Sequence, residues 1–242
     1  MRQWLSTAFT HVLDSALPPQ CPLCHGDLMA QGLCADCWHQ LHVIIPPFCD
    51  GCGRPLPHSY AIKKCGACLT QKSFLVRHRS VLVYNDAAKR LIVPFKHSDR
   101  LDFAPVIAGM MASAFQDMVQ DDHIIMPIPL HVLRRIKRRY NQSAEITRLL
   151  CRRTGRQSQS DMTSLKRIKP TTSLARHRLT KRKQILRGAF AINKTDILAL
   201  KGKRILLIDD VMTTGSTMEE AAKCLLQADV QSVEGLSFAR VC

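Results

Sequence analysis

The sequence predicts an α/β fold with a mostly parallel sheet flanked by helices, preceded by a small cysteine-rich module that depends on metal. Three observations support this prediction. Strand-like and helix-like segments alternate from about residue 73 onward. An aliphatic run at 205–208 is followed by two acids and a turn rich in hydroxyl groups. Eight of the 11 cysteines stand in Cys-x-x-Cys pairs between residues 21 and 68.

The first 19 residues are expected to form an amphipathic helix. Apolar residues recur there at helical spacing from Trp4 to Leu17. His11 and Asp14 interrupt what would be the apolar core of a signal peptide, so no signal peptide is predicted. No apolar run approaches the roughly 20 residues that cross a bilayer. We therefore expect a cytoplasmic protein with no membrane span.

Residues 20–72 are expected to form the cysteine-rich module. Each Cys-x-x-Cys knuckle can place two thiolates on one metal ion, so four pairs supply two tetrahedral Cys₄ sites, for which zinc is the expected ion. Disulfides are disfavoured without a secretory signal, and four pairs exceed what a redox dithiol needs. Consecutive ribbons and a cross-braced arrangement both agree with the spacing. The predicted ligands are Cys21, Cys24, Cys34, Cys37, Cys49, Cys52, Cys65 and Cys68.

Residues 73–242 are expected to form the α/β domain. Pro94 should end or kink the first helix of this domain. Ligands of such folds bind outside the carboxyl ends of the strands, so the loop after residue 208 should lie at the functional edge. Strands are expected at 79–84, 123–128, 188–192, 204–208 and 232–239, and helices at 87–95, 100–119 and 140–153.

The loop after the strand at 204–208 is the most informative stretch of the chain. It starts with Asp209 and Asp210 and leads into a good helix-forming segment. A helix N-terminus behind such a turn presents N–H donors and the positive end of its dipole, which suits a phosphate. The acids cannot serve a phosphate, so they should face a metal or a sugar. The residues predicted to bind the phosphate group are Val211, Met212, Thr213, Thr214, Gly215, Ser216 and Thr217.

Two plainer interpretations of this loop compete with a phosphate site. An ordinary strand-to-helix turn capped by Asp and Thr would need no ligand. Two acids, three threonines and a glycine at fixed offsets make a phosphate site the better explanation. A generic nucleotide loop is disfavoured because the Gly-Lys-Ser/Thr ending of a P-loop is absent.

Positive charge is concentrated in one part of the chain. The formal net charge is +16, and residues 131–187 hold 18 of the 35 Lys and Arg residues against two acids. This concentration predicts a polyanionic partner, although a merely solvated face is the alternative. The segment 163–187 shows little apolar periodicity and is expected to be a functional lid or disordered. Predicted contacts to pyrophosphate or nucleic acid are Arg134, Arg135, Lys137, Arg138, Arg139, Arg176, Arg178 and Lys181.

Taken together, these motifs resemble the ComF family of competence proteins, which includes the proteins often labelled GntX. Members combine a double zinc ribbon with a type I phosphoribosyltransferase-like domain. Family members commonly have glycine where Arg139 stands, and Leu174 and Ile185 occupy positions that are commonly Gln and Asn. Besides the cysteines, the resemblance is carried by Pro-Ile-Pro-Leu at 127–130, Arg-Arg-Tyr-Asn-Gln at 138–142, Arg-Gly-Ala-Phe at 187–190 and the loop at 209–217.

The resemblance implies a competence factor for natural transformation that handles incoming single-stranded DNA and binds phosphoribosyl pyrophosphate (PRPP) with Mg²⁺. It implies that Asp209 and Asp210, the candidate catalytic residues, hold the ribose hydroxyls, and that 213–217 wraps the 5′-phosphate. A competence helicase or DNA-processing proteins are the implied partners. The second hypothesis is an active phosphoribosyltransferase of nucleobase salvage that uses PRPP and Mg²⁺. Whether the chain is an enzyme stays open, because no nucleobase pocket is evident.

Overall fold

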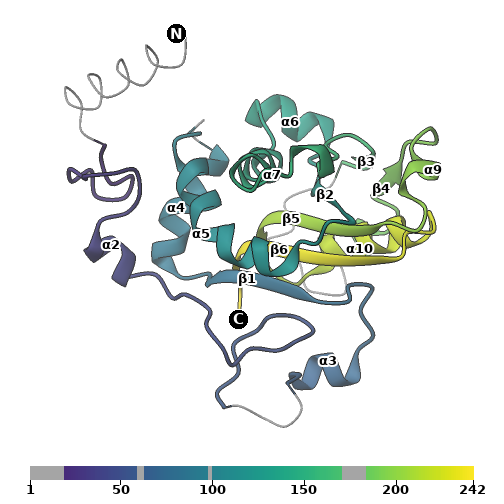
Figure 1. The fold of residues 1–242 in the computed structure, drawn as a ribbon, viewed down its shortest axis with the longest axis horizontal. Coiled ribbons are helices and arrows are strands. Elements are labelled where there is room, and N and C mark those ends of the chain that lie inside the picture. The colour runs from purple at the N-terminus through teal and green to yellow at the C-terminus, as the bar shows by residue number, and fades with distance from the viewer. Residues whose placement is uncertain (1–18, 59–62, 98–99, 171–183) are drawn as a thin grey trace.

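A computed structural model describes most of the chain (Figure 1). The N-terminal helix expected at 1–19 lies outside the described residues, apart from its last residue. Arg176, Arg178 and Lys181 lie outside them as well. The described residues are 19–58, 63–97, 100–170 and 184–242.

A four-stranded sheet forms the centre of the fold, and all its strands run parallel. Helices come between most of these strands in the sequence and provide the crossovers that parallel pairing requires. The predicted α/β class with a mostly parallel sheet is confirmed. The strand order is β1 (His78–Val83), β6 (Ser232–Arg240), β5 (Arg204–Met212) and β2 (His123–Pro127).

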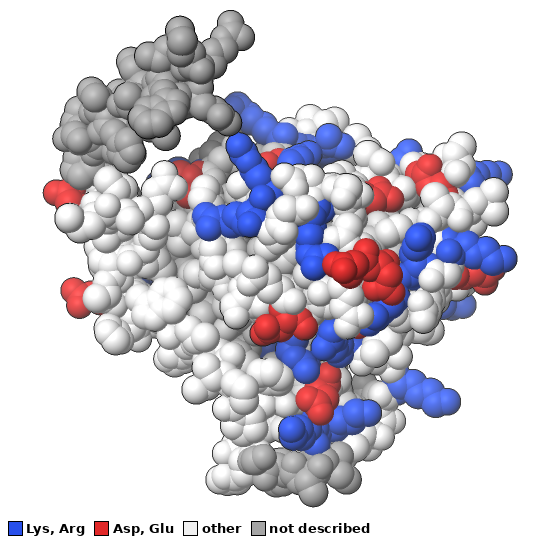
Figure 2. Space-filling view, viewed as in Figure 1, with Lys and Arg blue, Asp and Glu red and all other residues white. Residues whose placement is uncertain are grey.

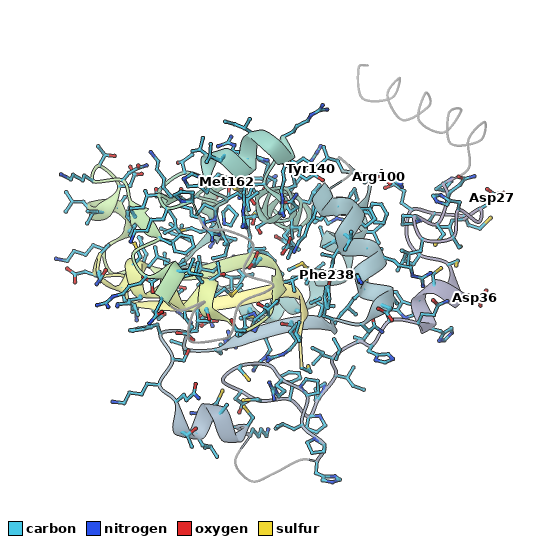
Figure 3. All side chains as sticks on the ribbon, turned by 180° about the vertical axis from the view of Figure 1, so that it is seen from behind. Asp27, Asp36, Arg100, Tyr140, Met162 and Phe238 are labelled. Atoms are coloured by element: carbon cyan, nitrogen blue, oxygen red, sulfur yellow. The ribbon has the colours of Figure 1, made fainter. Side chains whose placement is uncertain are left out.

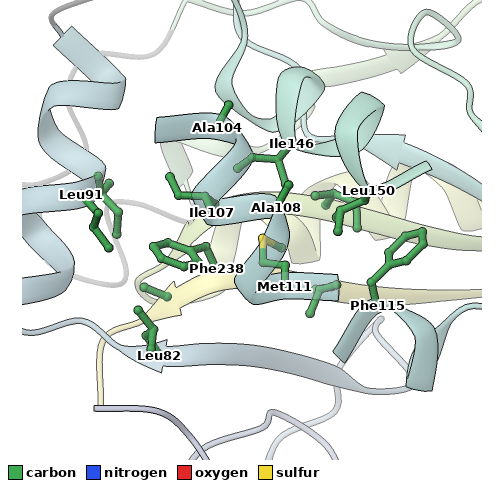
Figure 4. Packing of buried hydrophobic residues seen from close by; sticks show 14 of the residues in the cluster. Leu82, Leu91, Ala104, Ile107, Ala108, Met111, Phe115, Ile146, Leu150 and Phe238 are labelled. Carbon is green, nitrogen blue, oxygen red and sulfur yellow. The ribbon is translucent and has the colours of Figure 1, made fainter. Parts of the chain in front are cut away.

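The central strand β5 is buried on both faces, as its aliphatic run predicts. Leu206 and Ile208 belong to the larger core, which three helices cover. Figure 4 shows this side of the sheet, where Ala104 and Ala108 of one covering helix lie beside Ile146 of another. The three helices are α4 (Asp86–His97), α5 (Phe103–Met118) and α7 (Gln142–Arg153).

The opposite face of the sheet carries a second core. Ile205 and Leu207 point into it and meet the apolar side of α10 (Ser216–Leu226). Leu200 of the short helix α9 (Ile197–Leu200) completes this core together with an antiparallel hairpin. The hairpin consists of β3 (Leu165–Arg167) and β4 (Phe190–Ile192).

Two elements differ from the expected pattern because of their partners. β5 does not end at residue 208: it continues to Met212 because β6 is long enough to pair with it as far as Arg240. The acids therefore stand inside the last part of the ladder rather than after it. β3 lies in the segment where no element was expected, and its three residues alternate between buried and exposed in a run too short to recognise.

Two further short elements connect this framework. The helix α6 (Val132–Arg138) was not expected. Its apolar residues Val132, Leu133 and Ile136 are exposed, so this helix does not pack an apolar side against the core. A 3₁₀ turn, η1 (Gln157–Gln159), follows α7.

The cysteine-rich module meets the sheet at β1. Backbone atoms of residues 42–44 pair with the outer edge of this strand: Ile44 N donates to Val81 O at 2.8 Å, and Val83 N donates to His42 O at 2.9 Å. One-turn helices begin inside two of the knuckles and contain their second cysteines, Cys37 and Cys68. In Figure 3, Asp27 and Asp36 mark the part of the module that lies farthest from the sheet. These helices are α2 (Ala35–His39) and α3 (Gly66–Thr70).

Candidate functional site

The acidic pair lies where β5 continues beyond its neighbour β2. Pro127 of β2 pairs with Ile208, so the side of β5 that faces β2 opens from Asp209 onward, while β6 still pairs with the other side. Ligands of open α/β sheets bind at such strand ends. A pocket with room for about 160 Å³ lies there. It is lined by Lys96, Ile128, Leu130, Arg134, Arg138, Gln142, Ser143, Arg167, Asp209, Asp210 and Thr217.

Both acids already have partners on the protein. Asp209 Oδ1 accepts a hydrogen bond from Ser143 Oγ at 3.0 Å and another from the backbone N–H of Asp210 at 2.9 Å. Asp210 Oδ1 lies 3.0 Å from Lys96 Nζ. The two carboxylates are thereby held in fixed orientations at the pocket wall.

The electrostatic setting of Asp209 differs from that of an ordinary carboxylate. Burial, and next the charge of Asp210, raise the pKa of Asp209 to about 7, although Lys96 and hydrogen bonds from the Asp210 N–H and Ser143 act to lower it. Two adjacent acids in a partly buried site disfavour double ionisation for this reason. Asp209 consequently changes charge near neutral pH.

The loop between β5 and α10 has the geometry of an anion site. Gly215 adopts φ +76°, a left-handed conformation that favours glycine at this turn. The hydroxyls of Thr214 and Ser216 lie 2.8 Å apart. Ser216 begins α10, whose first-turn N–H groups have no partner within the helix, and Thr217 reaches the pocket wall.

Three arginines, Arg134, Arg138 and Arg167, line the pocket together with the acids. Burial lowers the pKa of Arg167 to about 10, and the nearby charge of Arg134 adds to this effect. Burial and the charge of Arg138 likewise lower the pKa of Arg134. Like charges gathered in a partly buried pocket repel one another, so an anionic ligand would relieve this repulsion.

The Tyr-Asn-Gln segment holds the pocket together. Asn141 caps α7 by accepting from Ser143 N at 3.2 Å, and its amide donates to Ile128 O at 3.0 Å. Tyr140 Oη and Gln142 Nε2 both donate to the carbonyl oxygen of Phe95, the latter at 3.3 Å. This segment therefore joins α7, the end of β2 and the end of α4 around the acids.

The cysteines form two clusters of four, each built from consecutive pairs. The sulfur atoms within each cluster lie within 4.8 Å of one another. Zn–S bonds of about 2.3 Å in a tetrahedron would place the sulfurs about 3.8 Å apart, close to the 3.5 Å between Cys24 and Cys34 and the 3.7 Å between Cys52 and Cys65. The clusters are 21/24/34/37 and 49/52/65/68.

Backbone donors prepare these clusters for metal. Burial acts to raise the pKa of Cys49, yet N–H groups including those of Cys52 and Cys65 lower this pKa to about 6. Cys21 occupies the same place in the first cluster, and its pKa is also lowered to about 6 by N–H donors, against the effect of burial.

Burial and hydrogen bonds to neighbouring sulfurs instead raise the pKa of Cys37 and Cys68. Zinc binding would therefore displace protons from these thiols, because thiolate is the form that binds the ion. The fit of both sites to zinc rests on the positions of the sulfurs.

Comparison with known proteins agrees with both halves of the structure. A double zinc ribbon domain matches residues 12–69, and a phosphoribosyl transferase domain matches residues 104–240. Competence protein F of Haemophilus influenzae is 29% identical over 230 residues, which cover 91% of this chain and 96% of that protein. Competence protein ComFC of Bacillus subtilis is 30% identical over 199 residues, which cover 81% of this chain and 78% of that protein.

The chain belongs to the ComF family. The DNA utilization protein YhgH of Escherichia coli is also similar, with 29% identity over 226 residues that cover 90% of this chain and 95% of that protein. This ComF-family chain thus carries two Cys₄ zinc sites and a phosphoribosyltransferase domain. The domain limits at residues 19/20 and 72/73 remain predictions. Among the described helices, none combines the length and apolarity required to cross a bilayer.

The predicted acidic, phosphate-binding and basic residues fall into four groups in this ComF-family fold. Residues 211–216 lie at the end of β5, in the turn that follows and at the start of α10, and none of them lines the pocket. Asp209, Asp210, Thr217, Arg134 and Arg138 meet in the pocket. Arg135 and Arg139 are exposed and do not line it. The side chain of Lys137 lies outside the described part, as do the three lid residues named above.

Sequence reasoning missed several residues of the pocket. Lys96, Ser143 and Arg167 come from three separate elements, and only the fold brings them to the acids. Gln142 lies in a segment that carries the family resemblance, but its place in the pocket wall was not predicted. No local pattern marks Lys96, which lies near the end of α4 between Phe95 and His97.

The acid pair does not fit a magnesium ion bound directly by the protein. Mg²⁺ prefers an octahedron of oxygen ligands, whereas Asp210 faces the ammonium group of Lys96 and Asp209 is engaged by Ser143. The ion that the resemblance implies would have to arrive with the pyrophosphate of its ligand.

Proposed function

We propose that this ComF-family protein handles single-stranded DNA and binds PRPP or a related phosphoribosyl ligand in the pocket at the end of β5. The observation that supports the ligand most strongly is the meeting of the acid pair, three arginines and Thr217 of the first turn of α10 in one pocket. The relatives named for competence and DNA utilization support the role in DNA handling.

Each part of the pocket suits one part of a phosphoribosyl group. The loop and the N-terminus of α10 would bind the 5′-phosphate through N–H groups and hydroxyls. Asp209 and Asp210 would accept hydrogen bonds from the 2′ and 3′ hydroxyls of the ribose. Arg134, Arg138 and Arg167 lie where they can neutralise a pyrophosphate.

Calorimetric titration with PRPP tests this assignment. We expect binding by the native protein and no measurable binding by Asp209→Ala, because the ribose would lose its hydrogen-bond acceptor. Asp117→Ala is the matched control, since Asp117 is an exposed residue of α5 away from the pocket. Unchanged affinity in Asp209→Ala would refute the role given to this residue.

The basic surface supports the proposal of DNA binding. Figure 2 shows Lys and Arg over the upper and right parts of one face, including the region that α6 occupies in Figure 1. Few aromatic residues are available for base stacking, with three Tyr, eight Phe and two Trp in the chain. Binding is therefore expected to be mostly electrostatic and indifferent to base sequence.

Fluorescence anisotropy with labelled oligothymidine tests the DNA role. The affinity should fall steeply as salt rises, with a log–log slope of about −0.7 for each phosphate contacted. Arg135→Ala should reduce this slope and leave PRPP binding unchanged, because Arg135 is exposed and does not line the pocket. Absent or salt-independent binding would contradict this part of the proposal.

An active phosphoribosyltransferase is the second candidate function. The phosphoribosyl transferase match and the acid pair beside the loop favour it. In this reaction an acceptor nitrogen bonds to C1 of the ribose while the bond from C1 to the pyrophosphate oxygen breaks. Pyrophosphate release from PRPP and Mg²⁺ that depends on an added nucleobase would establish turnover. Bound PRPP with no release across a panel of bases would leave the pocket with a binding role.

A further inference from the structure

Lys96 provides a positive charge beside the acids from within the protein. Its Nζ lies 3.0 Å from Asp210 Oδ1, inside the pocket rather than on the outer surface. The side chain of Lys96 is 22% exposed and that of Asp210 11%. Lys96 belongs to α4, more than 100 residues before the loop, so the pairing is a product of the fold.

The backbone around Lys96 is firmly held. The carbonyl oxygen of Phe95, the preceding residue, accepts hydrogen bonds from both Tyr140 Oη and Gln142 Nε2. The side chain of Phe95 is fully buried, and its ring centre lies 5.8 Å from that of Tyr140. The backbone of Lys96 is therefore fixed at the pocket wall, which restricts its side chain more than that of a lysine on the outer surface.

The charges in the pocket are sufficient for an anionic ligand without added metal. Four cationic side chains, Lys96, Arg134, Arg138 and Arg167, line it together with the two acids. A ligand phosphate can pair directly with the arginines and the helix N-terminus. Lys96 supplies a positive charge that balances the acid pair, and it occupies the place beside Asp210 that a divalent cation would need.

We infer that the pocket binds the pentose 5-phosphate part of its ligand without a divalent cation, because Lys96 supplies the positive charge beside Asp210. This inference rests on the proposed phosphoribosyl ligand and defines its class as a pentose 5-phosphate with free vicinal hydroxyls. Lys96 acts as a positioning residue. It orients the carboxylate of Asp210 so that its second oxygen remains available to a hydroxyl group.

Calorimetry with ribose 5-phosphate and with PRPP, each in excess EDTA and in excess MgCl₂, tests the inference. The native protein should bind ribose 5-phosphate with affinities that agree within about threefold in the two conditions. Lys96→Met keeps the aliphatic part of the side chain and removes its charge. We expect the affinity of this variant for ribose 5-phosphate to be about tenfold or more below that of the native protein in EDTA, and to recover in part in MgCl₂. Lys96→Arg should retain most of the metal-free affinity.

Lys89→Met is the matched control, because Lys89 is an exposed residue of the same helix. It should behave like the native protein, and circular dichroism should show every variant folded. Binding by the native protein only in MgCl₂, or equal EDTA affinities for Lys96→Met and the native protein, would overturn the inference and leave the proposed function intact. No binding of either ligand in either condition would overturn both.

Discussion

Gly53 lies directly against the backbone of His78. A Cβ at position 53 would stand 2.6 Å from the carbonyl oxygen of His78, and Gly53 has φ +68°. Because Gly53 follows Cys52 and His78 begins β1, the second cysteine cluster and the sheet share one contact surface. His78 N also donates to Gly51 O at 2.7 Å across this surface.

This contact predicts a large effect from a small side chain. Gly53→Ala should lower the free energy of unfolding by about 2–4 kcal/mol, because it adds a clash with backbone to an unfavourable left-handed conformation. Gly66→Ala is the control, since a Cβ at position 66 would meet no atom within 4 Å. Urea unfolding measures both. A Gly53→Ala protein as stable as Gly66→Ala would show that the knuckle can shift away from β1.

The two zinc sites should lose metal at different rates. Arg79 donates to Cys49 O at 3.3 Å and to Asp50 O at 3.0 Å, so the second cluster is anchored to β1, whereas Cys24 of the first cluster is exposed. Elemental analysis should find two zinc ions per chain. A chelator with a colorimetric readout should remove one equivalent quickly and the other slowly, and Cys24→Ser should abolish the fast phase alone. Release in a single phase would argue against this asymmetry.

Arg139 should be a site where glycine improves stability. It closes α6 with φ +60°, a conformation that costs a residue with a Cβ roughly 1 kcal/mol. Arg139→Gly is therefore expected to raise the free energy of unfolding by about 0.5–1 kcal/mol. Arg135→Gly, inside the same helix, should instead lower it by about 1 kcal/mol. Chemical denaturation of the two variants checks the contrast, and destabilisation by both would contradict it.

Ligand affinity should depend on pH through Asp209. With a pKa of about 7 set by burial and by the charge of Asp210, this acid is mostly ionised at high pH and mostly protonated at low pH. The ionised carboxylate is the stronger hydrogen-bond acceptor for a ribose hydroxyl, so ribose 5-phosphate affinity should fall about tenfold between pH 8 and pH 6 as Asp209 becomes protonated. Lys96 acts to lower this pKa.

Lys96→Met should consequently move the midpoint of the pH profile upward. The titration of the ligand phosphate is common to both proteins and cancels in the comparison. The measurement is affinity against pH for the two proteins in MgCl₂, where both should bind. Coincident midpoints would show that Lys96 does not influence the charge of Asp209.

Much of this architecture was predictable because the signals are local. The run at 205–208 is aliphatic because β5 is covered on both faces, and the cysteine spacing reflects the chemistry of a single metal ion. The acids and the loop are consecutive in sequence, so their proximity requires no knowledge of the fold.

The rest of the site depends on contacts between distant segments. Ser143 reaches Asp209 across 66 positions. It directly follows the Tyr-Asn-Gln segment, but no sequence spacing relates it to the acids. Glu219 appears in sequence as an ordinary helix former, yet its carboxylate accepts from Ser73 Oγ at 2.6 Å and from Phe74 N at 2.9 Å. The end of β5 was misplaced for a similar reason, because its length is set by pairing with β6.

The outer edge of β1 has a further consequence for the protein in solution. An unprotected edge strand offers unpaired N–H and C=O groups to any other chain, which invites aggregation. Here Ile44 N donates a hydrogen bond to Val81 O, and His42 O accepts one from Val83 N. Gly51 O accepts one from His78 N. Loss of zinc should release this cover, so apoprotein is expected to self-associate through exposed β1 as its concentration rises. Metal loading would then protect the edge of the sheet as well as fold the knuckles.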